Sequence, residues 1–168
     1  MLEIAIWLSE TKWSIALHES LYMYPWIESA HVLSICFFIG ILLFVDLRLM
    51  GAVFTKLPIS EMNKKVLPWS LFGFGLMALT GFLLFYAIPV RSYQNIFFRF
   101  KVILILFAGL NAFLFHRQMK LEGMNWDEGK SIPKSVHLKA AASLVLWSGV
   151  IISGRMIAYN WFDYDRQP

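Results

Sequence analysis

Four long apolar blocks alternate with shorter polar segments along this chain. A helix rises 1.5 Å per residue, so about 20 apolar residues cross the 30 Å hydrocarbon core of a bilayer. Each block has about that length, and the polar segments between the blocks carry Lys and Arg. The pattern therefore predicts four membrane spans, at about Trp26–Leu47, Leu67–Val90, Ile96–His116 and His137–Tyr159.

The segment before these blocks is less apolar. Leu2–Ser20 contains Trp7 and Trp13, which are typical of the membrane interface. Its four charged residues argue against a fifth span: Glu3, Glu10, Lys12 and Glu19. We therefore expect an all-α fold, with an N-terminal interfacial helix in residues 1–22, a four-helix transmembrane bundle in 23–161 and a short tail in 162–168.

Composition supports a membrane protein. Of the 168 residues, 58% are hydrophobic and only 15% charged, whereas a soluble domain has about 25% charged residues. Mean hydropathy is +0.60, which excludes a disordered chain. The net charge of +4 comes from cations in the connections. This placement points to the positive-inside rule and to the lipid bilayer as partner, not to nucleic acid.

Lys and Arg are unevenly divided between the two sides of the predicted bundle. Nine lie on one side: Arg48, Lys56, Lys64, Lys65, Arg117, Lys120, Lys130, Lys134 and Lys139. Six lie on the other: Lys12, Arg91, Arg99, Lys101, Arg155 and Arg166. The first side is predicted to be cytoplasmic, so both termini are periplasmic. Asp46 and Arg48 ("VDLRLMG") then close the first span at the inner face and are interpreted as a topology anchor.

Histidines near the span ends are the candidate chemistry. His116 ends the third predicted span and His137 begins the fourth, so antiparallel neighbours would place both rings at similar depth. Helical spacing puts Lys101 on the same stripe as His116, and Arg155 on the same stripe as His137. Each stripe thus has a cation at its outer end and a histidine at its inner end. His31 lies near the outer end of the first span, with Glu28 one turn before it.

Two interpretations fit these histidines. In the first, His116 and His137 ligate a b-type haem iron, and His31, opposite His18, serves a second site, which gives one haem or two. Cations would then pair with the haem propionates: Arg48, Arg117 and Lys139 inside, and Arg99, Lys101 and Arg155 outside. In the second, the rings are interfacial residues and the small residues beside them serve packing. A third alternative uses His31, His116 and His137 as ligands for copper.

Three stretches carry a family resemblance: "YPWIESAHVLSICFFIGILLFVDLRLMG", "GFLLFYAIPVRSYQNIFFRFKVILILFAGLNAFLFH" and "WSGVIISGRMIAY". They resemble small bacterial four-span membrane proteins of unassigned function, from about Tyr24 to Tyr159. The first span is also distantly similar to the copper-resistance D domain and to the haem-binding membrane protoporphyrinogen oxidase. Diheme cytochrome b proteins share the plan of histidines at both faces. The resemblance implies a multi-pass protein of the bacterial inner membrane.

These observations lead to a functional hypothesis. We expect a b-type haem protein that transfers electrons, linked to the quinone pool and to a redox partner or a second copy of the chain. A membrane oxidoreductase, including one acting on a porphyrin, stays open. The alternative is a copper-handling protein or a non-catalytic accessory subunit of a membrane complex, because the loops are short and no substrate motif is present.

Overall fold

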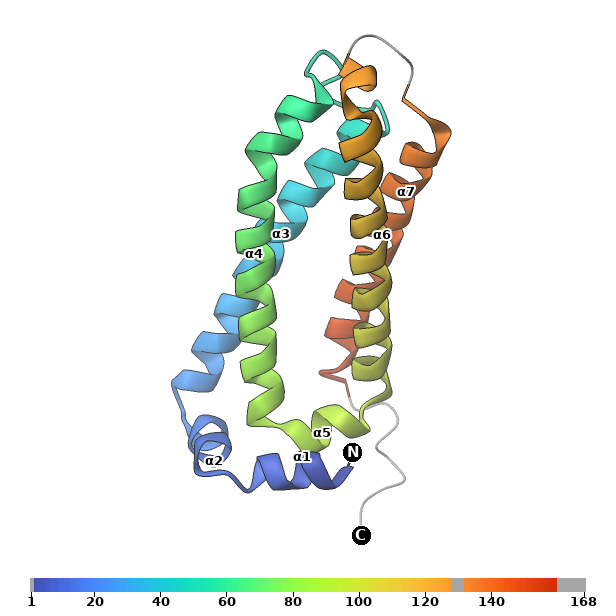
Figure 1. Ribbon diagram of the computed structural model, residues 1–168. Helices are drawn as coiled ribbons and strands as arrows, with labels where there is room; N and C mark the ends of the chain where they lie inside the picture. Colours follow the sequence, from blue (N-terminus) through green and yellow to red (C-terminus); the bar gives the residue numbers. More distant parts are fainter. Residues whose placement is uncertain (1, 128–131, 160–168) are drawn as a thin grey trace.

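The computed structural model describes residues 2–127 and 132–159, and these are helical apart from short connections. Four long helices form the bundle in Figure 1: α3 (Met23–Leu49), α4 (Ile59–Ala87), α6 (Ile96–Asp127) and α7 (Lys134–Met156). Each is long and apolar enough to cross a membrane. The predicted all-α bundle of four spans is therefore confirmed. The predicted tail, 162–168, lies outside the described residues.

The long helices pack in two antiparallel pairs. Helix α3 packs mainly on α4, and α6 mainly on α7, while α3–α7 and α4–α6 contacts join the pairs. At one end of the bundle lie the short helices α1 (Leu2–Ser9), α2 (Lys12–Glu19) and α5 (Pro89–Gln94) (Figure 1). We call this the N-terminal end. The opposite end carries the α3–α4 connection and the start of α7 (Figure 1).

Several helix boundaries differ from the sequence prediction. Helix α4 begins at Ile59 and continues through Pro68, where the span was predicted to begin. Proline removes only one backbone donor, and an apolar environment favours keeping all the other helical bonds. Helix α4 ends at Ala87, because Pro89 disfavours helical backbone at the residue before it. Helix α6 continues to Asp127, beyond His116, where the third span is predicted to end.

The N-terminal segment forms two short helices instead of one. The Thr11 side chain caps α2 by accepting a bond from the Ser14 amide. The hydroxyls of Thr11 and Tyr86 are 2.7 Å apart, and Ser14 Oγ donates to the Tyr86 carbonyl at 2.7 Å. These bonds attach α2 to the end of α4 and leave Trp7 and Trp13 exposed. The segment therefore lies beside the bundle end and is not a fifth span.

Two apolar clusters hold the helices together. The central cluster consists of Phe38, Met77, Ala108, Trp147 and Val150. The end cluster lies toward the opposite end of the bundle and consists of Leu49, Ile59, Phe115, Met119, Val136 and Ala140. Many other large apolar side chains are exposed on the outer surface. In a bilayer these face lipid, so their exposure carries no hydrophobic cost.

Arg48 shapes the connection between α3 and α4. Its side chain is buried, and its guanidinium donates to the Leu57 carbonyl from Nε at 3.1 Å and from Nη2 at 2.6 Å. Nη2 also donates to the Thr55 carbonyl at 3.1 Å. Gly51 has a φ of +75°, which lets the chain turn away from the end of α3. Arg48 therefore fixes the loop that returns the chain into α4.

The close approach of α3 and α4 generates a stability prediction. A Cβ atom added at Gly73 would lie 2.9 Å from Phe37 Cδ1 and 3.3 Å from Phe38 Cβ. At Gly75 nothing lies within 4 Å. Both substitutions to Ala gain the same helix propensity, so the contrast isolates the overlap. We expect G73A to be less stable than G75A by about 1–3 kcal/mol in unfolding measured in detergent. Equal stability would contradict the close helix contact.

The Arg48 contacts generate a second prediction. The substitution R48M keeps an apolar stem but removes every bond to the loop carbonyls. We expect a loss of about 2–4 kcal/mol in the free energy of unfolding, since bonds from charged donors contribute most. Lys65, which is largely exposed and pairs with Glu61 at 2.7 Å, provides the control. K65M should cost less than about 1 kcal/mol, and a similar loss in both variants would argue against the loop contact.

Candidate functional site

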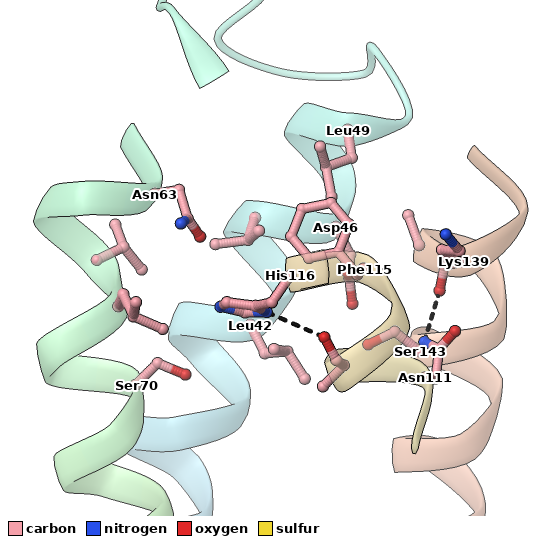
Figure 2. A pocket seen from close by; sticks show the side chains of 15 residues that line it. Leu42, Asp46, Leu49, Asn63, Ser70, Asn111, Phe115, His116, Lys139 and Ser143 are labelled. Carbon is pink, nitrogen blue, oxygen red and sulfur yellow. Dashed lines mark hydrogen bonds between the residues drawn. The ribbon is translucent and has the colours of Figure 1, made fainter. Parts of the chain in front are cut away.

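A cavity of about 60 Å³ lies between the four long helices, on the side of the central cluster nearer the opposite end. Every one of these helices contributes to its wall (Figure 2). The polar residues that line it are Asp46 from α3, Asn63 and Ser70 from α4, Asn111 and His116 from α6, and Lys139 and Ser143 from α7. A polar cavity inside a bundle of apolar helices is the most unusual feature of this structure.

Asp46 is the buried carboxylic acid of this cavity, with an exposed fraction of 4%. Ser143 from α7 lines the same cavity, and Asp46 Oδ2 has no hydrogen-bond partner. Within the described part of the chain, no Lys or Arg forms an ion pair with it. An unpaired carboxylate away from water is costly, so this group needs a proton, a cation or water.

His116 contributes the second unsatisfied atom. Its Nδ1 lies 3.0 Å from the carbonyl oxygen of Ala112 (Figure 2). A carbonyl only accepts, so Nδ1 carries the proton and the neutral ring has a lone pair on Nε2. Nε2 is buried and has no partner. The ring is thus held in the tautomer that offers Nε2 as a base or as a metal ligand.

These two orphan atoms belong to one cavity. Among the residues that the structure describes, Asp46 Oδ2 and His116 Nε2 are the buried side-chain polar atoms without a hydrogen-bond partner. A cavity of 60 Å³ has room for about four water molecules, since each needs roughly 10–15 Å³ of this kind of volume. The cavity that these two residues line can therefore hold water.

A second polar level lies nearer the N-terminal end. His31 is buried, and its Nδ1 is 2.8 Å from Thr80 Oγ1. Thr80 donates its own proton to the Leu76 carbonyl at 2.7 Å, so it accepts from His31 and leaves His31 Nε2 with the lone pair. Lys101 is the charged neighbour of this ring. From His31 to Asp46 the helix α3 advances about 22 Å.

Glycines make room for this second level. A Cβ atom at Gly81 would lie 3.1 Å from His31 Cε1, and one at Gly154 would lie 3.3 Å from Lys101 Nζ. The imidazole therefore rests against α4, and the ammonium group rests against α7. The central cluster of apolar residues separates this level from the cavity.

The other predicted site residues lie elsewhere. His137 is exposed and does not line the cavity, so His116 and His137 do not share it. His18 is exposed on α2, in a groove at the N-terminal end that His31 does not line. Glu28 is exposed although His31 is buried. Arg155 is exposed, with its guanidinium 5.6 Å from the Tyr159 ring centroid.

The cavity restricts which groups fit beside its donors. Sites for drug-sized ligands have volumes of about 300–1,000 Å³, so a haem macrocycle does not fit in 60 Å³ while the helices keep this packing. Among the residues whose side chains the structure describes, 2–121 and 132–159, no group of three or more His, Cys, Asp or Glu residues could hold a metal. Water, a proton or a small cation fits the space.

Sequence reasoning missed the central residue of this cavity. Asp46 was interpreted as a topology anchor, and Asn111 and Ser143 were not selected as site residues. A signal was present, because Asp46 lies inside an apolar block and has no cation one turn before it. Asn111 was detectable in the same way, as an amide in the middle of a span. Its Nδ2 donates to the Lys139 carbonyl at 2.9 Å (Figure 2).

Comparisons with known proteins give a family and no activity. No curated protein and no solved structure matches the chain. A family model described as a family of unknown function, DUF6644, matches residues 19–160, which include all four long helices up to Met156. The chain therefore belongs to the DUF6644 family.

Proposed function

We propose that the Asp46 carboxyl group of this chain binds and releases a proton inside the membrane. In this proposal, proton binding at Asp46 is part of the activity of the protein. One observation carries the proposal. Asp46 and His116 both line the cavity between the four apolar helices, and each has a buried side-chain atom without a hydrogen-bond partner. Ionisable residues at membrane depth are expensive and typically serve proton or ion pathways.

The chemistry at this site is acid–base chemistry. A protonated carboxyl group provides an O–H donor, and neutral imidazole provides the Nε2 acceptor. Water in the cavity would connect the two groups without any movement of the helices. Ser143 lines the same cavity and provides a hydroxyl group within it. Asp46 is the proton-binding group in this proposal, and His116 is the base that shares its water.

Infrared spectroscopy of the protein in lipid tests this proposal directly. We expect a carboxyl C=O band from protonated Asp46 that changes with pH and is absent in D46N. H116Q should shift the pH dependence, because it replaces a titratable base with an amide. E61Q serves as the matched control, since the Glu61 side chain is 57% exposed on α4. If D46N retains every pH-dependent carboxyl band of the parent protein, the proposal is wrong.

A second candidate function is b-type haem binding and electron transfer, linked to the quinone pool and a redox partner. It is favoured by the ring orientations: His31 and His116 each use Nδ1 as donor and keep Nε2 as acceptor. Iron- and copper-ligating histidines are commonly fixed in this way. A haem at His116 would require α3–α4 to move away from α6–α7, because the cavity is too small for it.

An absorption spectrum of protein expressed with ample haem tests this candidate. A haem site predicts a Soret band that H31A or H116A reduces. H18A and H137A should leave it unchanged, since both rings are exposed. Metal analysis of the same samples detects copper without haem, which would favour the copper-handling alternative. A preparation with neither metal nor Soret band rejects this candidate and leaves the proton proposal standing. Stoichiometric co-purification with a larger enzyme would favour the accessory subunit.

A further inference from the structure

A row of polar side chains leads from the cavity toward the opposite end of the bundle. Lys139 lines the cavity, and its Nζ donates to Gln118 Oε1. Gln118 Nε2 in turn donates to Ser135 Oγ at 3.1 Å. Ser135 is exposed at the second residue of α7, so the row ends at the surface. Lys139 Nζ also lies 3.5 Å from the Leu114 carbonyl oxygen, which helps to fix it between α6 and α7.

The cavity is otherwise bounded by apolar side chains along the bundle axis. Toward the N-terminal end lies the central cluster, where the Phe38 and Trp147 rings meet edge-to-face with centroids 4.8 Å apart. Toward the opposite end lies the end cluster, which includes Phe115 and Ala140 from the cavity wall. Apolar constrictions of this kind exclude water. Asn63 of α4 also lines the cavity near this end, and among the described contacts the row through Lys139 is the hydrogen-bonded connection from the cavity to the surface.

We infer that the cavity exchanges protons with one side of the membrane only, the side at the start of α7, through the row Lys139–Gln118–Ser135. This inference rests on the proposed function of Asp46. The titratable residues that line the cavity are Asp46 from α3, His116 from α6 and Lys139 from α7, whereas α4 contributes the uncharged Asn63 and Ser70. Lys139 does not react in this scheme. It is a positioning residue that keeps the mouth of the cavity polar and hydrated.

The first test follows hydrogen–deuterium exchange of the Asp46 carboxyl band after transfer from water to D₂O. K139M keeps the length of the side chain and removes its donors, so we expect exchange at least tenfold slower. K139R retains charge and donors and should exchange close to the parent rate. K134M is the matched control, because Lys134 is exposed at the start of the same helix. Exchange in K139M as fast as in the parent, or faster, overturns the route.

A second test uses water access and does not depend on the protonation of Asp46. In a C36A background, S70C places a thiol on the cavity wall. Silver ion added to sealed vesicles of each orientation should protect this thiol from later alkylation only from the side at the start of α7. K139M should reduce that protection at least tenfold. Equal protection from both sides, or from the side of the N-terminal end alone, overturns the inference. If the Asp46 band is missing but protection is one-sided, the proton proposal fails and the route stands.

Discussion

A polar group buried among apolar helices must find its partner inside the protein, because lipid supplies none. Within the helices the backbone N–H and C=O groups bond to each other. The need for an internal hydrogen-bond partner therefore falls on the polar side chains. At the level of His31, Thr80 is this partner. Its hydroxyl accepts a hydrogen bond from the His31 ring and donates one to the Leu76 carbonyl. At the level of Asp46 and His116 it is met only in part, and one atom of each residue has no partner. The structure therefore concentrates its unsatisfied polarity in one cavity, and the functional argument begins there.

The pairing of the helices explains why the cavity lies where it does. Within the α3–α4 pair, Gly73 allows the close contact with Phe37 and Phe38. Within the α6–α7 pair, Asn111 donates to the Lys139 carbonyl. The two pairs contact each other less extensively than the helices within each pair. A space between the pairs can thus hold water without loss of the contacts that make each pair stable, and side chains from all four helices reach it.

The sequence was sufficient to predict four spans, because the length and apolarity of each block are set by the bilayer. It selected His116 as a candidate site residue near the end of the third span, and the structure places this residue on α6 in the cavity wall. It did not identify the partner of His116, because depth follows from position along a helix whereas contact also depends on rotation about the axis. His137 lies near the start of α7 with an exposed side chain. Asp46, interpreted as an anchor, is buried and lines the cavity.

The size of the cavity helps to distinguish between the two candidate functions, proton binding and haem binding. A macrocycle beside His116 would separate the helix pairs and disturb the central cluster, in which Phe38 and Trp147 join α3 to α7. The edge-to-face pairing of these rings contributes about 0.5–1.5 kcal/mol, so haem binding would first have to offset that contact and the other van der Waals contacts of the cluster. A proton with a few water molecules would fit in the existing 60 Å³ without moving a helix. The packing therefore favours proton binding, because that function requires no rearrangement of the helices.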